Sequence, residues 1–432
     1  MKMANMDDYF DVVIVGTGAA GLYCALNLPA RYRILLLTKQ KADESDSFLA
    51  QGGICMQHGE ADYRPFFDDT MRAGHYENNP ATVDLMIRSS NSIIRDLVRR
   101  GVRFARDDNG ALRFTREGAH SRPRILFHED ITGHEITQTL LNEVLRCENI
   151  ELREHTTLLD FFADASACGG VIAAGPDGEP RAIGAGAVVL ACGGIGGLYK
   201  NSTNFPHITG DAIAMALRHG VACEHLDYIQ IHPTTLYSHR KGRRFLISES
   251  VRGEGALLLD KNGNRFTNEL QPRDVVSAAI RAQMEKDSTD HVWEDMRPIG
   301  EAAIREHFPN ILERCEEEGY DPIHEPIPVV PAQHYFMGGI TADLSSRTAL
   351  PRLYACGETC CNGVHGRNRL ASNSLLESLV FAQRAADDIL YGEPPVFTGD
   401  KPDLAPYREQ EPLFAAYRQE VLTAIERSKN HE

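Results

Sequence analysis

The sequence lacks any long apolar run, holds a single tryptophan, and is short of positive charge. No stretch approaches the roughly 18 apolar residues of a membrane-spanning helix, and the N-terminal MKMANMDDYF has no apolar core of the signal-peptide kind. Lys and Arg number 45 against 61 Asp and Glu, a formal net charge of −16. Because nucleic acids and anionic membranes attract basic surfaces, we expect neither as a partner, and we expect a cytoplasmic protein.

The ten cysteines are scattered and show no metal-binding spacing. The cluster of Cys356, Cys360 and Cys361 has no second Cys or His pair at zinc-finger distance. His128 and His134 lie near glutamates, but not in an HExxH pattern. We therefore predict no metal site in this chain.

What the sequence does contain is a strand–turn–helix–strand unit at residues 11–38. The β-branched run DVVIV is followed at once by Gly16-Thr17-Gly18-Ala19-Ala20-Gly21. In this context the glycines let the backbone approach a pyrophosphate, whose charge lies at the helix N-terminus. The second strand ends at Lys39 rather than at the acidic residue that holds the ribose of NAD. The pattern favours FAD; the alternatives are a structural turn and a solvated lysine.

Apolar periodicity predicts the next elements. Residues 82–100 and 132–147 have helical spacing, and residues 150–163, 170–174 and 187–190 are typical of strands. The last strand runs into the glycine cluster of VVLACGGIGG, as a doubly wound fold places a second glycine turn against the same ligand. The polar, glycine-rich DSFLAQGG, which begins at Asp46, predicts a loop along the cofactor.

The composition changes from about residue 224 to 332. This part holds the only tryptophan, charged helical stretches at 275–285 and 301–318, and a proline-rich exit. The dinucleotide-fold pattern then returns, with a strand at 353–355 and a helix at 374–390. These changes indicate an inserted domain.

The predicted fold class is α/β, a doubly wound, Rossmann-like FAD-binding domain with an inserted α+β capping domain. The FAD-binding domain takes residues 1–225 and 336–391, the capping domain takes 226–335, and 392–432 form a short tail with one weak helix.

Four glycine-rich patches combine His, Arg and small polar residues, at 116–120, 230–233, 248–274 and 334–374. Singly, each has an ordinary explanation, such as a packed histidine beside proline or an ion pair of Arg273 with Asp274. Together they predict a clamp for a dicarboxylate, because Arg presents a planar fork to a carboxylate. The Ser372-Asn373-Ser374 start of a helix is either an ordinary N-cap or a positive helix end for a reduced flavin ring.

The chain resembles the flavoprotein family of succinate dehydrogenases and fumarate reductases, above all the members that oxidise L-aspartate. The resemblance lies in VGTGAAG, AQGGI, TREGAHS, QIHPT, SESVRGEG, PRD, QHYFMGG, YACGET and HGRNRLASNSLLES, in this order between residue 11 and about 390. It implies FAD contacts at Gly16, Thr17, Gly18, Ala19, Ala20, Lys39, Asp46, Ser47, Ala50, Gln51, Gly52, Gly53, Asp211, Glu358, Ser374 and Leu375.

The same resemblance implies the roles around the substrate. One carboxylate is expected on His232 and Ser248 and the other on His334 and Arg369. Further residues complete the expected site, with Arg273 as proton donor and acceptor, Glu249 and Arg252 as its relay to solvent, and Glu117 on the substrate ammonium group. The alternative for Glu117 is a surface loop charge. Ser248 and Cys192 depart from the usual Thr residues of the family.

The implied activity is oxidation of L-aspartate to iminoaspartate by hydride transfer to flavin N5, with O2, giving H2O2, or fumarate as the electron acceptor. In the family this is the first step of NAD biosynthesis, and quinolinate synthase uses the product. The FAD is expected to be non-covalent, since Asp46 replaces the histidine that carries covalent FAD and no His lies between Lys39 and Gln57. A C-terminal helical bundle of the relatives is expected to be largely absent. The alternatives are a soluble fumarate reductase or succinate dehydrogenase-type flavoprotein, and a non-catalytic FAD-binding protein.

Overall fold

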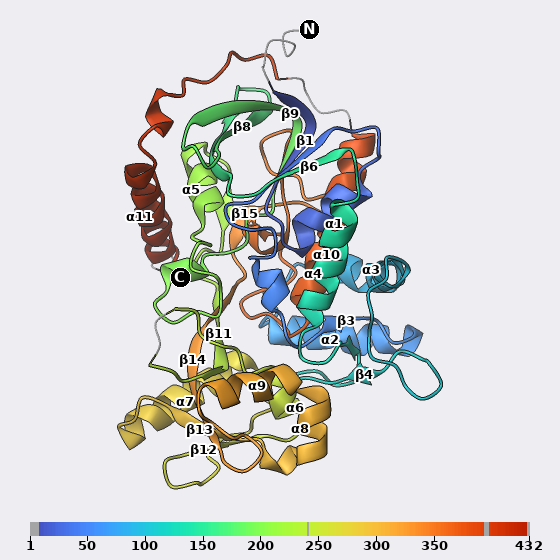
Figure 1. The fold of residues 1–432 in the computed structure, drawn as a ribbon, viewed down its shortest axis with the longest axis vertical. Helices are drawn as coiled ribbons and strands as arrows, with labels where there is room; N and C mark the ends of the chain where they lie inside the picture. Colours follow the sequence, from blue (N-terminus) through green and yellow to red (C-terminus); the bar gives the residue numbers. More distant parts are fainter. Residues whose placement is uncertain (1–7, 240–241, 393–396, 430–432) are drawn as a thin grey trace.

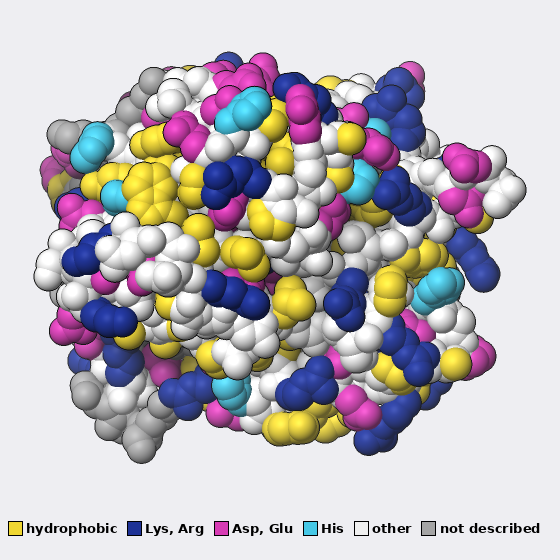
Figure 2. All heavy atoms as spheres, turned by 90° about the horizontal axis from the view of Figure 1, so that it is seen from below, with side chains coloured by type: hydrophobic (Ala, Val, Ile, Leu, Met, Phe, Trp, Pro, Cys, Tyr) yellow, Lys and Arg dark blue, Asp and Glu magenta, His cyan; other side chains and the backbone are white. Residues whose placement is uncertain are grey.

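The computed structural model describes residues 8–239, 242–392 and 397–429, so the remaining pieces of the predicted domains and tail lie outside it. Figure 1 shows two parts, an upper part built on a parallel sheet and a smaller lower part that holds β12, β13 and α6 to α9. Among the described residues, no helix has the length and apolar character needed to cross a membrane. Figure 2 shows the lower part from below, with basic, acidic and hydrophobic side chains mixed over its face.

The upper part is organised by a seven-stranded sheet of order β6-β2-β1-β9-β8-β7, in which β16 also pairs with β9. Its central strands are apolar because helices cover both faces. The parallel strands are β1 (Tyr9–Val15), β2 (Ile34–Leu37), β6 (Ile150–Arg153), β9 (Pro180–Leu190) and β16 (Leu353–Ala355). Two antiparallel strands extend the sheet, β7 (Thr157–Ala163) and β8 (Cys168–Ala174). Strand β9 begins seven residues earlier than the predicted 187–190, because its first half pairs with β8.

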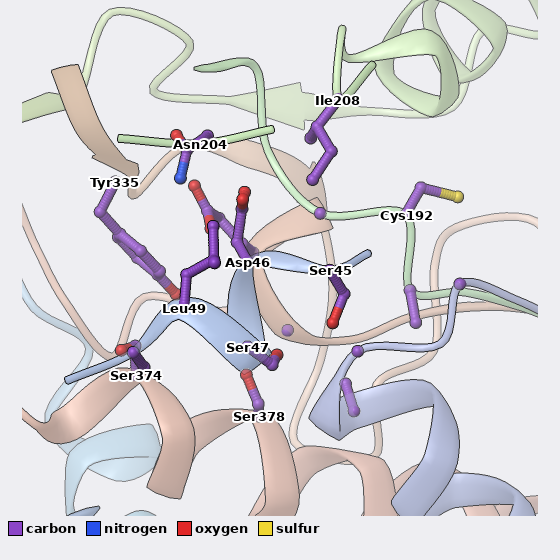
Figure 3. A pocket seen from close by; sticks show the side chains of 18 of the residues that line it. Ser45, Asp46, Ser47, Leu49, Cys192, Asn204, Ile208, Tyr335, Ser374 and Ser378 are labelled. Atoms are coloured by element: carbon purple, nitrogen blue, oxygen red, sulfur yellow. The ribbon is translucent and has the colours of Figure 1, made fainter. Parts of the chain in front are cut away.

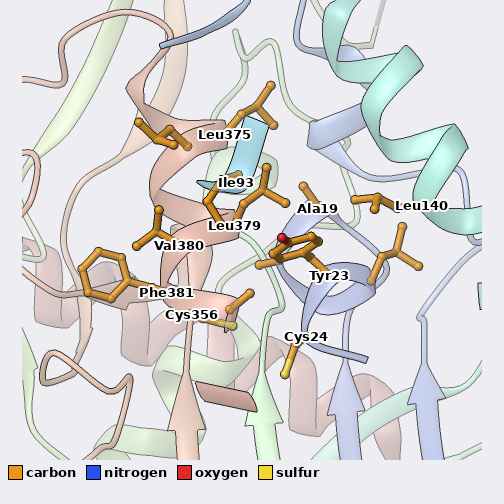
Figure 4. Close-up of a cluster of buried hydrophobic side chains, with 14 of the residues drawn as sticks. Ala19, Tyr23, Cys24, Ile93, Leu140, Cys356, Leu375, Leu379, Val380 and Phe381 are labelled. Atoms are coloured by element: carbon orange, nitrogen blue, oxygen red, sulfur yellow. The ribbon is translucent and has the colours of Figure 1, made fainter. Parts of the chain in front are cut away.

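Four helices pack on one face of this sheet in a single hydrophobic cluster, namely α1 (Ala19–Asn27), α3 (Pro80–Arg99), α4 (Thr132–Val144) and α10 (Asn373–Tyr391). Figure 4 shows Ala19 and Tyr23 of α1 facing Leu375 and Leu379 of α10. The two helices are more than 300 residues apart in the sequence. The contact therefore brings the C-terminal part of the fold onto the glycine turn that precedes α1.

On the other face lie α5 (Asp211–Arg218) and α11 (Gln410–Lys429). The sequence predicted one weak helix in the tail, and the structure has a 20-residue helix there. It buries Tyr417, Val421 and Ile425 against the sheet face that α5 covers. The sequence signal for this helix is weak because only one narrow apolar stripe runs along α11. Packing of that stripe against the rest of the protein stabilises the helix.

The lower part has its own antiparallel sheet of order β11-β14-β13-β12, with β11 (Ile229–Leu236), β12 (Leu257–Leu259), β13 (Val292–Asp295) and β14 (Ile327–Phe336). Its helices are α6 (Glu249–Gly253), α7 (Arg273–Asp287), α8 (Glu301–His307) and α9 (Pro309–Glu317), packed around a separate hydrophobic cluster. The single helix predicted at 301–318 is in fact two, because Pro309 disfavours helical backbone at Phe308. Strands β11 and β14 connect this part to the upper one (Figure 1).

Two small sheets and a further helix complete the fold. One three-stranded sheet contains β3 (Ile54–Cys55), β4 (Phe114–Thr115) and β5 (Ile125–Leu126). The other contains β10 (Cys223–Glu224), β15 (Gly339–Thr341) and β17 (Cys360–Cys361), and α2 (Tyr63–Ala73) packs beside α3. Among the described residues the fold is thus α/β in its upper part and α+β in its lower part; the domain boundaries given above stay predictions.

Candidate functional site

A large cavity lies where β1, β2 and β9 end and the lower part begins. It encloses about 1680 Å³ of non-atom space, including the portion open to solvent. In Figure 3, Asp46 and Leu49 from one segment, Tyr335 from another and Ser374 and Ser378 of α10 surround the same space. Of the residues predicted to touch FAD or substrate, all but three line this cavity. The three exceptions are Ala19, His232 and Arg252.

The glycine turn after β1 leaves no room for side chains. Gly16 has φ +113°, and a Cβ there would lie 2.0 Å from the carbonyl oxygen of Ala191. A Cβ at Gly21 would lie 1.9 Å from the carbonyl oxygen of Gly16. Gly18 occupies the N-cap position of α1 without a side-chain cap, so the positive end of the helix borders the cavity. The Ala19 N–H donates to Ser47 Oγ (3.0 Å), which explains why Ala19 itself lies behind the lining.

Lys39 and Asp211, both FAD contacts implied by the family resemblance, form an ion pair at the cavity edge. Lys39 Nζ donates to Asp211 Oδ2 (2.7 Å) and to the carbonyl oxygen of His207 (3.2 Å). The lysine is therefore not a free solvated charge, which was the alternative from sequence. Both groups keep further hydrogen-bonding capacity toward the cavity.

Two more predicted FAD contacts, Asp46 and Glu358, are half-buried carboxylates that lie near each other. Asp46 accepts from the Phe205 N–H (2.9 Å), and Glu358 accepts from the Phe336 N–H (2.9 Å). Burial raises the pKa of both carboxyls, and the charge of Asp46 raises that of Glu358 further. A Cβ at Gly194 would lie 2.3 Å from Glu358 Oε1, so a glycine makes room for this carboxyl.

The lining also presents buried polar atoms that lack a hydrogen-bond partner within the described chain, namely Ser45 Oγ, Asp46 Oδ2 and Gln51 Oε1. Leaving such a group unpaired costs about 1–3 kcal/mol. A polar ligand with both donors and acceptors would satisfy them. Together with the glycine turn and the helix end, these atoms fit a dinucleotide such as FAD.

Beside this region two arginines converge on one glutamine. Arg273, at the start of α7, donates from Nε to Glu249 Oε2 (2.5 Å) and from Nη1 to Gln230 Oε1 (2.8 Å). Arg369 donates from Nη2 to the same Gln230 oxygen (3.2 Å) and from Nη1 to Ser374 Oγ (2.6 Å). Burial lowers the pKa of Arg369 to about 10, so it stays cationic at neutral pH. Sequence reasoning did not single out Gln230, although it stands in the QIHPT motif.

The two predicted histidines meet edge to face, with ring centroids 5.0 Å apart. His334 Nδ1 lies 2.7 Å from Thr203 Oγ1, and His232 Nδ1 lies 2.9 Å from the carbonyl oxygen of Thr234. Burial and then the Arg273 charge hold the pKa of both rings well below the usual range, so both are neutral. His232 Nε2 has no partner in the described structure, so it keeps a hydrogen-bonding position although His232 is not a lining residue.

Glu117 and Glu249 are two buried carboxylates with different surroundings. Glu117 accepts hydrogen bonds from Ser250 Oγ (2.9 Å) and Ser372 Oγ (2.6 Å), and burial followed by the Glu249 charge raises its pKa. Burial would also raise the pKa of Glu249, but Arg273 and Arg252 hold it below the usual value. Glu117 is 3% exposed, which excludes the alternative of a surface loop charge.

Ser248 and Arg252 do not stand free in the cavity. Ser248 caps α6 by accepting from the Ser250 N–H (3.2 Å). Arg252 lies behind Glu249 at 3.8 Å and donates to the carbonyl oxygen of Glu269 (2.7 Å). The ordinary N-cap, one of the two interpretations of Ser372, is absent: its φ is +61°, and its hydroxyl donates to Glu117 and accepts from no N–H of α10.

Of the cysteine cluster, Cys356 lines the cavity, whereas Cys360 and Cys361 do not. Burial raises the pKa of the Cys361 thiol to about 12 and those of Cys356 and Cys360 well above their usual value. Glu224, His225 and Cys361 each bring one potential metal-ligating atom to within 4.8 Å of the others. The prediction of no metal site stays a prediction.

Comparison with known proteins assigns the family. The family model described as FAD binding domain matches residues 11–375. An L-aspartate oxidase of Clostridium perfringens is 48% identical over 380 residues, which cover 88% of this chain and 86% of that protein. An L-aspartate oxidase of a Nostoc species is 44% identical over 98% of this chain and 76% of that protein.

Solved structures show the same fold. A quinol-fumarate reductase with menaquinol has a TM-score of 0.84 at 32% identity, over 95% of this chain and 75% of that one. Sdh1 of Mycobacterium smegmatis in complex with UQ1 has a TM-score of 0.76 at 31% identity, over 90% and 70% of the two chains. The fold class and FAD as the cofactor are therefore as the sequence predicted. By its motifs, its cavity and these relatives, the chain belongs to the L-aspartate oxidases, FAD-dependent oxidoreductases of the succinate dehydrogenase and fumarate reductase flavoprotein family.

Proposed function

We propose that this enzyme oxidises L-aspartate to iminoaspartate with FAD. The observation that carries the proposal is a buried carboxylate, Glu117, in the same cavity as groups suited to two carboxylates. Fumarate and succinate carry no cation, so either would leave the charge of Glu117 uncompensated. L-Aspartate supplies the two carboxylates and the ammonium group together.

The substrate carboxylates would bind at two places. Arg369 and His334 would hold one carboxylate, Arg369 with its charge and the unpartnered Nε. His232 would hold the other, with Ser248 beside it. To donate from Nε2 to this carboxylate, His232 must take the tautomer in which Nδ1 accepts from the Thr234 N–H (3.2 Å) and does not donate to the Thr234 carbonyl oxygen (2.9 Å).

Bound FAD supplies the acceptor for the hydride that leaves the substrate α-carbon. The substrate nitrogen must also lose a proton. Arg273 would take that proton only after releasing its own to Glu249, because a charged guanidinium cannot accept one. Because Glu249 and Gln230 fix its guanidinium, a proton released by Arg273 passes to Glu249, with Arg252 next in the relay. The lower part would close over the cavity and exclude water, which strengthens each of these charge interactions.

We further propose non-covalent FAD, because Asp46, whose Oδ1 accepts from the backbone of Phe205, replaces the histidine of covalent flavoproteins. Fumarate or O2 is the electron acceptor; fumarate is a dicarboxylate that suits the same arginine and histidines. The reaction would begin NAD biosynthesis in the cytoplasm, with quinolinate synthase consuming the imine.

The first test is anaerobic mixing of the holoenzyme with L-aspartate and, separately, with succinate. We expect L-aspartate to bleach the visible flavin absorbance and succinate to leave it unchanged. Glu117→Gln should lower kcat/KM for L-aspartate by roughly 10- to 100-fold, the range of a lost charge-assisted hydrogen bond, while fumarate reduction with an artificial donor continues. Bleaching by succinate alone would favour the succinate dehydrogenase-type alternative instead.

A further inference from the structure

Both carboxylate oxygens of Glu117 are held by serine hydroxyls from distant segments. Oε1 accepts from Ser250 Oγ of α6 (2.9 Å), and Oε2 accepts from Ser372 Oγ just before α10 (2.6 Å). The serines are 133 and 255 residues from Glu117 in the sequence. All three side chains are buried. The carboxylate is therefore fixed from two sides, one in the lower part of the fold and one in the upper.

Ser372 adopts an unfavourable backbone conformation while it makes this contact. Its φ of +61° is left-handed, a conformation that residues with a Cβ rarely adopt. It stands at the N-cap position of α10, yet its hydroxyl makes no cap hydrogen bond. Strain of this kind persists where the surroundings require it, often at functional sites. Here the hydroxyl is directed to Glu117 rather than to the helix.

Glycines leave the space that this arrangement needs. A Cβ at Gly52 would lie 2.2 Å from Glu117 Oε1 and 3.5 Å from Ser372 Oγ. A Cβ at Gly118 would lie 2.4 Å from Glu249 Oε1. A carboxylate offers about four lone-pair positions, and the serines use one on each oxygen. The remaining positions are open to a further donor.

We propose that Ser250 and Ser372 are positioning residues for substrate selection, which orient Glu117 to accept the ammonium group of an α-amino dicarboxylate. This inference rests on the proposed function and adds how the site selects, for oxidation, a dicarboxylate that carries an amine. An ionised Glu117 only accepts hydrogen bonds, so both serine hydroxyls can donate to it. A protonated Glu117 carries an O–H of its own, which leaves fewer acceptor positions for the serines. The two serines thus favour the ionised form against burial and the nearby charge of Glu249.

The test compares Ser250→Ala, Ser372→Ala and the double variant as holoenzymes. Each single change should lower kcat/KM for L-aspartate by about 5- to 10-fold, mainly through KM, and the double change should lower it further. Fumarate reduction with an artificial donor should keep its KM within about twofold, since fumarate has no ammonium group. Ser250→Thr, which keeps the hydroxyl, should retain most of the activity toward L-aspartate.

A pH profile supplies a second measurement. Burial already raises the pKa of Glu117, and loss of a donor to its ionised form raises it further. The defect of the variants toward L-aspartate should therefore grow as the pH falls, because protonated Glu117 lacks the negative charge that pairs with the ammonium group. The matched control is Ser346→Ala: Ser346 is also buried with φ +62°, but its hydroxyl donates to the carbonyl oxygen of Phe381, away from the cavity.

If the serines had only a structural role, their alanine variants would lose FAD content, L-aspartate oxidation and fumarate reduction to the same extent. That outcome overturns the inference. So does an unchanged ratio of the two activities, or an equal change in Ser346→Ala. If the unmodified enzyme fails to oxidise L-aspartate, the proposed function itself is wrong, a result visible before any variant is made.

Discussion

At the scale of single residues, the environment of each buried charge decides its chemistry. Glu117 and Glu249 are the same residue type in one cavity, yet the pKa of one is raised by burial and that of the other is lowered by two arginines. The first is suited to accept from a cation and the second to stabilise Arg273. Such a division of roles between neighbouring carboxylates is a frequent property of active sites.

Arg273→Lys tests the proton-transfer role at this scale. Lysine keeps the positive charge but loses the fork that binds Glu249 and Gln230 together. We expect kcat for L-aspartate to fall by about 100-fold or more, the range of general acid–base catalysis, with FAD content unchanged. Stopped-flow flavin reduction measures the step directly. Arg281→Lys, an exposed arginine on the same helix, is the control; a normal reduction rate in Arg273→Lys would contradict the role.

At the scale of elements, the site depends on helices that the sequence places far apart. Helix α10 lines the cavity at its start and packs on α1 along its length, so one element connects the substrate groups to the glycine turn. Helix α7 begins with Arg273 itself, and its next turns pack in the core of the lower part. The first residues of α10 and of α7 therefore lie on the cavity, one from each part of the fold.

Helix α11 offers a test of packing on the opposite face. Val421 is fully buried, and its methyl groups lie 3.5 and 3.6 Å from the position of a Cβ on Gly210, which precedes α5. Val421→Ala should lower the free energy of unfolding by about 1–3 kcal/mol, measured by denaturant titration. The exposed Arg418→Ala on the same helix should change it by less than about 0.5 kcal/mol. Equal stability of the two variants would show that α11 does not pack as described.

At the scale of the whole molecule, the cavity exists because two separately packed parts meet. The upper part supplies the glycine turn and α10, and the lower part supplies α6 and α7. Bound FAD would contact residues from both the upper and the lower part of the fold. A ligand that binds only the folded state stabilises it by mass action.

Removal of FAD tests both the mode of binding and this stabilisation. Acid precipitation of the holoenzyme should leave the yellow flavin in the supernatant, because Asp46 offers no covalent attachment. The FAD-depleted protein should have a Tm several degrees lower, and added FAD should restore it. Flavin that stays with the precipitated chain would contradict non-covalent binding, and addition of riboflavin alone is the control for the dinucleotide.

The sequence by itself determined the family, the cofactor and the order of elements, because strand–glycine–helix patterns and ordered motifs depend on local chain geometry. Most of the residues that it singled out for FAD and substrate line the cavity, since each motif residue carries its own chemical signature. It could not show that Gln230 joins two arginines, that Ser250 and Ser372 hold Glu117, or that His232 and Arg252 lie behind the lining. Those contacts join residues up to 255 positions apart, so only tertiary packing decides which side chains meet and which buried charge finds a partner.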